Sequence, residues 1–427
     1  MSAPSTSTHR PVGVPAHLPD RLTVCLWDFS WYVLAGPGEP YADLDAALDE
    51  TAARGYTTVR ICAAPLLLHG DLGLDDLADE LPVDGMGPRP DGARFGAGTR
   101  WYAVPGGHRV RLRDRFFALL RGLHRRGMSV VLAGWEYQQS PALCADERWF
   151  RAIDAIPTAD RPAALAAALT RMLDEIAAAG LAEVVALVEL HNEVDFSALP
   201  ALDDPATTTA IAALRAAHPG HLVTASLGKP PHLAMHTLPA VLGAGQLHVY
   251  AYGVLDRLQQ LLDIRGTATA DFPNALLRSL QRPGSPTWPD YGRPVSWKLA
   301  ATVVTDQMLY GYDTLDPDAW DAWLYRYYGT FHEAMQREIT ARVTAVAAWG
   351  RWREVPVVIG EGWVGYTPLG GWFEEGPIGR RLAETGIRAA AREGIWGITP
   401  CSNAAPHHPM WREAGWQRAV NEEFRRA

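Results

Sequence analysis

The sequence predicts an α/β fold, a (β/α)8 (TIM) barrel, from two observations. Apolar runs of roughly five to eight residues recur along the chain, and each is followed by a helical pattern, which is typical of the βα units of a parallel sheet. Eight such runs occur, the number that closes a barrel. The chain has 427 residues, a length that such barrels reach when their loops contain insertions.

The expected strands are short and rich in β-branched and other apolar residues, as in strands that are buried on both faces. Neighbouring residues of a strand point to opposite faces, so alternate residues share a face. In chain order, the strands are expected at Leu22–Trp27, Thr57–Cys62, Ser129–Ala133, Val184–Leu190, Leu222–Ser226, Gln246–Tyr250, Val355–Ile359 and Ile395–Thr399.

The expected helices show apolar residues at helical spacing, and several are followed by glycine, the residue that helix C-termini prefer. These glycines are Gly55, Gly127, Gly180 and Gly394. The helices are expected at Leu44–Ala53, Leu112–Arg126, Pro162–Ala179, Thr207–Ala217, Leu233–Leu242, Pro317–Ala348, Gly379–Arg392 and Met410–Phe424.

Two connections are too long to be plain turns, residues 63–109 after the second strand and residues 253–316 after the sixth. Both follow strands, so both are expected on the face of the barrel where functional loops gather. The second contains an aromatic stretch at residues 286–297, which could roof a binding site or pack as a surface insertion. Residues 1–20 are expected to be a disordered N-terminal segment, and residues 21–427 a single barrel.

The composition excludes several classes of protein. The formal charge of −9 and the pI near 5.9 argue against a nucleic-acid partner, because phosphate binding needs concentrated positive charge, and a neutral substrate fits better. No apolar run approaches the length of a membrane span, and the N-terminus lacks the apolar core of a signal peptide, so a cytoplasmic location is expected. The four cysteines show no Cys-x-x-Cys spacing and are expected to be reduced core residues.

Polar residues at the strand ends suggest chemistry. The fourth apolar run leads to Glu193 and the seventh to Glu361, and a pair of carboxyl groups is suited to acid/base catalysis. His248 and Tyr250 share one face of the sixth strand. Arg60 interrupts the second strand, where a cation inside a barrel requires an anionic partner. A strand-end carboxylate could be that partner.

These residues resemble the cellulase-like retaining glycoside hydrolases of clan A. Asn192 and Glu193 are similar to the family's Asn-Glu motif on the fourth strand, whose glutamate is the general acid/base. Glu361 matches the nucleophile at the end of the seventh strand. His248 and Tyr250 match the His-x-Tyr motif of the sixth strand, in which the tyrosine hydrogen-bonds the nucleophile.

The resemblance extends from about residue 21 to residue 411, and its strength is the order of four separate motifs. Arg60 matches the family's arginine on the second strand, close to the nucleophile. There are two departures. Val194 stands where proline is frequent, and the third strand ends in Trp135 and Glu136, where histidine is often found. The departures concern the exact family and the sugar more than the reaction.

The resemblance implies cleavage of a β-type glycosidic bond by double displacement, with two carboxyl groups about 5–5.5 Å apart. It makes Glu193 the acid/base and Glu361 the nucleophile, which Arg60 and Tyr250 keep ionised. Neither a cofactor nor a metal is required. The further residues expected to bind or support the substrate are Asn192 at the 2-hydroxyl, His191 and His248 at other hydroxyls, Glu136, and the tryptophans Trp135, Trp363 and Trp396.

The expected partner is a small carbohydrate, a short oligosaccharide or glycoside, held in a pocket suited to exo-action. Two alternatives stay open. A metal-dependent barrel is one, because His191, Glu193, Asp195, His248 and Glu361 are ligand types that divalent ions use. A non-catalytic sugar-binding barrel is the other. The sequence does not specify the sugar, the linkage, the aglycone or the oligomeric state.

Overall fold

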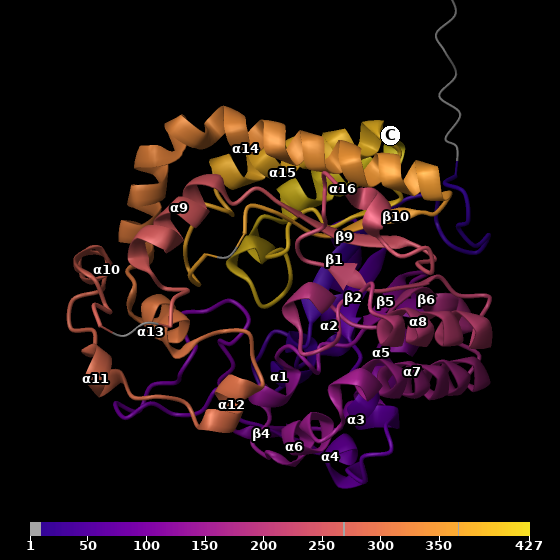
Figure 1. Ribbon diagram of the computed structural model, residues 1–427, viewed down its shortest axis with the longest axis horizontal. Helices are drawn as coiled ribbons and strands as arrows, with labels where there is room; N and C mark the ends of the chain where they lie inside the picture. The colour runs from indigo at the N-terminus through magenta and orange to yellow at the C-terminus, as the bar shows by residue number, and fades with distance from the viewer. Residues whose placement is uncertain (1–9, 268–269, 366) are drawn as a thin grey trace, which may run out of the picture.

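The computed structural model describes residues 10–267, 270–365 and 367–427. Nine buried strand segments form one parallel sheet at its centre (Figure 1). They are β1 (Leu22–Asp28), β2 (Thr58–Cys62), β5 (Ser129–Ala133), β6 (Val185–Glu189), β7 (Val223–Thr224), β8 (Ser226–Leu227), β9 (Gly245–Tyr250), β10 (Val357–Trp363) and β11 (Gly397–Ile398).

The strand order turns this sheet into a nearly closed barrel. The order is β7-β6-β5-β2-β1-β11-β10-β9-β8, and the paired neighbours run parallel. The two segments at the ends of this order, β7 and β8, are halves of one stretch, residues 223–227, that pairs with β6 first and with β9 next. The predicted α/β barrel is therefore confirmed, and each of the eight expected runs overlaps a barrel strand.

The longer helices surround this sheet and agree with seven of the eight expected ones. Local signals explain where the helices begin and end. Asp43 is the N-cap of α2 (Leu44–Ala53), because its Oδ1 accepts the backbone N–H of Ala46 at 2.9 Å. Gly55, Gly127, Gly180 and Gly394 have φ of 81, 61, 72 and 75°, as left-handed C-caps require. The helices are α2 (Leu44–Ala53), α5 (Leu112–Arg125), α7 (Arg161–Ala178), α8 (Pro205–Ala217), α14 (Pro317–Arg353), α15 (Pro377–Arg392) and α16 (Ala414–Arg426).

The helix predicted at residues 233–242 was wrong. That stretch contains only the 3-10 turn η5 (Met235–Thr237). Pro239 falls within the stretch and Pro231 shortly before it, and an interior proline lacks an N–H and clashes with the preceding turn. The long helix α14 instead packs on β9, as Figure 1 shows, and also contacts η5.

Two long segments separate a barrel strand from the next surrounding helix, and we name them the first insertion (residues 63–109) and the second insertion (residues 253–316). The first contains α3 (Pro65–His69), α4 (Asp75–Asp79) and β3 (Leu81–Val83), which pairs antiparallel with β4 (His108–Val110) where the insertion ends. The second contains α9 (Gly253–Leu262), α10 (Ala275–Ser279), α11 (Trp288–Tyr291), α12 (Ser296–Ala300) and α13 (Asp306–Thr314). The shorter helices α1 (Ser30–Val33) and α6 (Arg148–Asp154) lie outside them.

Buried polar contacts tie the two insertions together. The carboxylate of Asp313 accepts the backbone N–H groups of Gly96 and Gly98, at 2.7 and 2.6 Å, and the hydroxyl of Tyr291 at 2.6 Å. The buried Arg100 of the first insertion pairs with Glu375 in the loop after β10. The aromatic stretch at residues 286–297 packs within this assembly, and none of its three aromatic residues is among those that line the cavity described below.

The opposite end of the barrel is closed by an apolar cluster that includes a residue of the N-terminal segment. Leu18 is buried there with Leu22, Val131 and Trp396. Leu18 and the partly buried Val14 therefore pack against the barrel, which differs from the expectation of a disordered segment at residues 1–20, and residues 1–9 lie outside the described residues. The four cysteines are buried and free, as expected. No helix in the described part of the chain has both the length and the apolar character to cross a membrane.

Candidate active site

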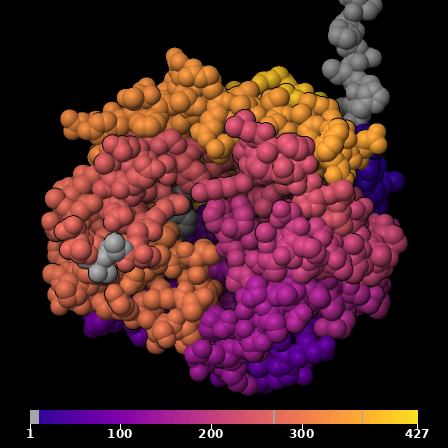
Figure 2. Space-filling view, viewed as in Figure 1, coloured from indigo at the N-terminus to yellow at the C-terminus, as the bar shows by residue number. Residues whose placement is uncertain are grey.

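A cavity of about 330 Å³ opens at the carboxyl ends of the barrel strands. Its walls come from β9, from β10, from the segments that follow β5, β6, β8 and β11, and from both insertions. In Figure 2 the surface is hollowed between the orange second insertion and the magenta central part of the chain. The carboxyl ends of barrel strands are where the active sites of such folds lie.

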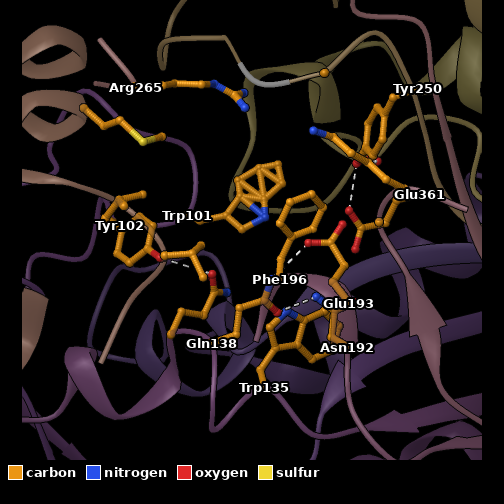
Figure 3. A pocket seen from close by; sticks show the side chains of 18 of the residues that line it. Trp101, Tyr102, Trp135, Gln138, Asn192, Glu193, Phe196, Tyr250, Arg265 and Glu361 are labelled. Atoms are coloured by element: carbon orange, nitrogen blue, oxygen red, sulfur yellow. Dashed lines mark hydrogen bonds between the residues drawn. The ribbon is translucent and has the colours of Figure 1, made fainter. Parts of the chain in front are cut away.

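The two expected glutamates meet in this cavity (Figure 3). One carboxylate oxygen of Glu193, one of Glu361 and one ring nitrogen of His248 all lie within 4.8 Å of one another. Glu361 is in β10 beside a register shift against β9. Glu193 ends the turn after β6 with φ of 41°, in the left-handed region that a non-glycine residue rarely adopts. Strained backbone of this kind gathers at functional sites.

Glu361 is surrounded by donors that favour its charged form. Arg60 Nη1 donates to Oε1 at 2.8 Å, and the Tyr250 hydroxyl donates to Oε2 at 2.7 Å. Burial alone would raise the pKa of this carboxyl, but the positive charges of His248 and Arg60 and the tyrosine hydrogen bond outweigh it and lower the pKa. Glu361 is therefore ionised at neutral pH.

Arg60 is held in place by a second carboxylate that the sequence analysis did not assign to it. Glu189, the last residue of β6, accepts from Arg60 Nε at 2.7 Å and from Nη2 at 2.8 Å, and both side chains are fully buried. Gln246 Nε2 also donates to Glu189, at 2.8 Å. The signal was available, because a charged residue inside an apolar strand requires an opposite charge. Trp135 covers the guanidinium, with 4.6 Å between the Cζ atom and the ring centre.

The Glu193 carboxyl group has one neutral donor and one histidine as neighbours. Gln138 Nε2 donates to Oε2 at 2.9 Å, and His248 Nδ1 lies 2.8 Å from Oε1. Burial raises the pKa of Glu193, the hydrogen bond to His248 opposes this, and the negative charge of Glu361 raises it further. The site thus pushes the pKa values of its two carboxyl groups in opposite directions.

A chain of hydrogen bonds joins the two carboxyl groups through Asn192. Arg60 Nη2 donates to Asn192 Oδ1 at 2.5 Å, and Asn192 Nδ2 donates to Gln138 Oε1 at 2.7 Å. Arginine can only donate, so every amide along the chain has a fixed orientation, and Gln138 must present its N–H to Glu193. Asn192 lines the cavity, and both of its amide atoms are also bound to protein.

His248 lies between the two carboxyl groups and not at the cavity surface. Its Nε2 is 3.6 Å from Glu361 Oε1, and its side chain is fully buried. Burial lowers the pKa of this imidazole, but the charge of Glu361 and the contact with Glu193 outweigh it and raise the pKa. His248 therefore acts on the electrostatics of the glutamates more directly than on substrate hydroxyls.

Two other polar candidates have structural contacts. His191 is buried, its Nε2 accepts the backbone N–H of Tyr137 at 3.1 Å, and its Nδ1 is 2.6 Å from the carbonyl of Asn192. Burial lowers the pKa of His191 to about 4, so it is neutral. The carboxylate of Glu136 accepts the backbone N–H groups of Leu66 and Leu67 at the start of α3, and burial raises its pKa to about 8. Neither side chain lines the cavity.

The three tryptophan candidates lie in different parts of the structure, and one of them is in the cavity. Trp135 lines the cavity. Trp363 is buried against Gly386 of α15 and donates to the carbonyl of Pro400 at 3.1 Å. Trp396 precedes β11 in the apolar cluster at the closed end of the barrel, so it is too far down the strand to reach a sugar. The structure instead places Trp101, from the first insertion, in the cavity (Figure 3).

Sequence reasoning also missed Gln138, Ser402 and Asn403, which line the cavity. Each follows a barrel strand, so a search for polar residues beyond the strand ends would have found them. Ser402 Oγ is 3.0 Å from the hydroxyl of Tyr250. Asn403 donates its amide to Glu374, and its Oδ1 is buried with no partner among the described residues. Trp101 had no such signal, because it lies deep in a long insertion.

The donor set gives the metal alternative little support. Glu193, His248 and Glu361 come close enough to hold an ion, but His191 and Asp195 make other contacts. Glu361 already has the Arg60 guanidinium as its cation. A metal ion beside that group would meet like-charge repulsion.

Residues 24–201 and 293–425 match the family described as "Cellulase-like: Sugar-binding cellulase-like". The chain belongs to this family. The chain also resembles the crystal structure of a putative glycoside hydrolase from Parabacteroides distasonis, with 19% identity, a TM-score of 0.67, and coverage of 95% of this chain and 93% of that one. This likeness shows a glycoside hydrolase-like TIM-barrel fold.

Two further structures are similar at lower scores. A family 5 mannosidase from Rhizomucor miehei has 10% identity and a TM-score of 0.43, covering 95% of this chain and 94% of that one. An endo-1,4-β-D-mannanase from Thermotoga petrophila has 12% identity and a TM-score of 0.41, covering 89% and 87%. No curated protein matches the chain.

Proposed function

We propose that this protein is a retaining glycoside hydrolase that cleaves a β-type bond in a short oligosaccharide or glycoside. The observation that supports this best is the pair of carboxyl groups in one cavity, Glu361 held ionised and Glu193 with a raised pKa. One oxygen of each group lies within 4.8 Å of the other, a proximity that accords with the about 5–5.5 Å between the two carboxyl groups of retaining enzymes.

In the first step, Glu361 attacks the anomeric carbon and forms a glycosyl ester as the glycosidic bond breaks. Glu193 gives its proton to the departing oxygen, so the leaving group departs as a neutral alcohol. Arg60 and Tyr250 hold the attacking carboxylate in one orientation through hydrogen bonds to its two oxygens.

In the second step, Glu193 takes a proton from water, and the water oxygen attacks the same carbon and releases Glu361. The change of role follows from the electrostatics. The charge of Glu361 raises the pKa of Glu193, and that charge is lost once the ester forms. The pKa of Glu193 then falls, which converts the acid into a base for the second step.

The dimensions of the cavity favour a small substrate. A volume of about 330 Å³ is at the lower end of the range for ligand sites, and both insertions contribute walls. Trp101 and Trp135 offer aromatic faces, and Ser402 and Asn403 add polar groups to the lining. These features favour exo-action on a short chain.

A panel of 4-nitrophenyl β-glycosides of glucose, mannose, galactose and xylose tests the proposal. We expect hydrolysis of at least one, with the β-anomer of the sugar seen first by NMR. Glu361→Gln should abolish turnover, while Glu183→Gln, at an exposed glutamate outside the site, should not. An α-anomer as the first product, or full activity in Glu361→Gln, would contradict the proposal.

The family's description favours one other candidate, a sugar-binding barrel without catalysis. This alternative predicts that sugars bind to the wild type and to Glu361→Gln with equal affinity and are never cleaved. Calorimetric titration beside the hydrolysis panel separates the two functions.

A further inference from the structure

The cavity contains two cations that the catalytic scheme does not use. Arg265 from the second insertion and Lys229 from the segment after β8 both line it. The Cζ atom of Arg265 lies 5.7 Å from the ring centre of Tyr252, and Nζ of Lys229 lies 5.3 Å from that of Phe196. Both side chains therefore rest against aromatic walls of the cavity.

Neither cation has an anionic partner within the part of the chain that the structure describes. No ion pair joins a carboxylate to Arg265 or to Lys229 among these residues. The remaining residues, 1–9, 268–269 and 366, include no Asp or Glu. The carboxylate of Asp195 lies near Lys229 in the fold, but it accepts the backbone N–H groups of Gly228 and Lys229, at 2.9 and 2.8 Å.

Lys229 stands on the acid side of the cavity. A Cβ atom built on its neighbour Gly228 would lie 2.5 Å from Glu193 Oε1 and 2.8 Å from the ring of Phe196, so these groups are in direct proximity. Because Glu193 protonates the departing oxygen, this side of the cavity receives the leaving group. Arg265 rests on Tyr252, whose ring centre lies 5.4 Å from that of Tyr250, and in Figure 3 its side chain lies across the view from Glu361.

The rest of the lining contains no cation. Apart from the two catalytic carboxyl groups it is neutral, and Trp135, Asn192, Ser402 and Asn403 offer aromatic, amide and hydroxyl groups. The positive charge of the lining is confined to Arg265 and Lys229. The net charge of −9 suggested a neutral substrate, whereas these two local positive charges favour an anionic group on the substrate.

We propose that the leaving group of the substrate contains an anionic substituent, a carboxylate or a sulfate, which Arg265 and Lys229 bind. This inference rests on the proposed function, because it uses Glu193 as the acid to define the leaving-group side. Arginine and lysine bind such anions through charge-assisted hydrogen bonds. Both residues lie in the segment 202–292, outside the residues that match the family model, so family membership does not supply this preference.

The test uses matched probes that differ only in charge. The 4-carboxyphenyl and 4-carbamoylphenyl β-glycosides of glucose, mannose, galactose and xylose have nearly the same shape, and only the first is anionic at pH 7. Affinity is measured by quenching of tryptophan fluorescence, because Trp101 and Trp135 line the cavity. This readout does not require turnover.

For at least one sugar, we expect the carboxylate to bind about three- to tenfold more tightly than the amide, a modest ratio because both cations are solvent-exposed. Arg265→Gln and Lys229→Gln should each reduce the ratio, and about 0.5 M NaCl should remove most of it. The control is Arg257→Gln, an exposed arginine on α9 that does not line the cavity, which should leave the ratio unchanged.

The proposal is overturned if no carboxylate binds more tightly than its amide, including the case in which none of the probes binds. It is also overturned if the preference survives in both glutamine variants, or if Arg257→Gln removes it equally. Hydrolysis without a charge preference rejects this inference and leaves the proposed function intact. A charge preference in binding without hydrolysis of any glycoside rejects the catalytic function instead.

Discussion

Tyr250→Phe is the most informative single substitution at the site. It removes one hydroxyl, which donates to Glu361 Oε2 at 2.7 Å, and it leaves the ring and the Arg60 contact in place. A hydrogen bond to a charged group contributes about 1.5–3 kcal/mol. At 1.36 kcal/mol per unit, its loss should raise the pKa of Glu361 by about one to two units.

The sign of the pH effect follows from the role of Glu361. The nucleophile acts only when ionised, so kcat/KM falls as the pH drops through the pKa of Glu361. A higher pKa moves this acidic limb to higher pH, and kcat/KM near neutrality should fall by about 10- to 100-fold if the lost energy stabilises the transition state. The assay is kcat/KM against pH on the best aryl glycoside of the panel.

Tyr32→Phe is the matched control, because the Tyr32 hydroxyl is buried and has no hydrogen-bond partner among the described residues. Its pH profile should equal that of the wild type. Circular dichroism and the unfolding midpoint establish that Tyr250→Phe is folded. A fall in activity with an unmoved acidic limb, or a limb that moves to lower pH, would refute the assigned effect of Tyr250 on Glu361.

Three further substitutions test other contacts. Glu193→Gln should lower kcat/KM by about 10²–10⁴-fold for alkyl glycosides and much less for 4-nitrophenyl glycosides, which need little acid assistance; equal losses on both would contradict an acid role. Gly228→Ala places a Cβ atom 2.5 Å from Glu193 Oε1 and should reduce kcat with little change in the unfolding midpoint, whereas Gly220→Ala, with open space around it, should change neither. Arg60→Met leaves the buried Glu189 and Glu361 without their cation, and urea unfolding should show a loss of about 3–5 kcal/mol; an unchanged stability would refute the assigned pairing.

Much of the barrel was predictable because its signals are local. A strand buried on both faces shows a continuous apolar run, and a glycine after a helical pattern marks its end, as at Gly127 and Gly180. The expected helix at residues 233–242 was wrong because Pro239 interrupts the apolar residues at helical spacing. The packing of Leu18 under the barrel was not foreseen, since it depends on distant residues that the local composition does not reveal.

The site was predictable in its centre and not in its walls. Glu193, Glu361, Arg60 and Tyr250 lie at strand ends or within strands, so the order of the strands brings them together. Trp101 and Arg265 come from the two insertions, whose paths depend on tertiary contacts such as those of Asp313. His191 and Trp396 share the residue types of a sugar site, but one faces a neighbouring backbone and the other lies at the closed end of the barrel.

The measurement that tests the central claim most directly is covalent trapping of the nucleophile. The protein is incubated with 2-deoxy-2-fluoro β-glycosyl fluorides of glucose, mannose, galactose and xylose, and the intact protein and its peptides are analysed by mass spectrometry. The account predicts one fluoroglycosyl unit per chain, located on the peptide that contains Glu361 and absent from Glu361→Gln. A label on another residue would contradict it. So would the absence of any label from a protein that hydrolyses the glycoside and releases the α-anomer first.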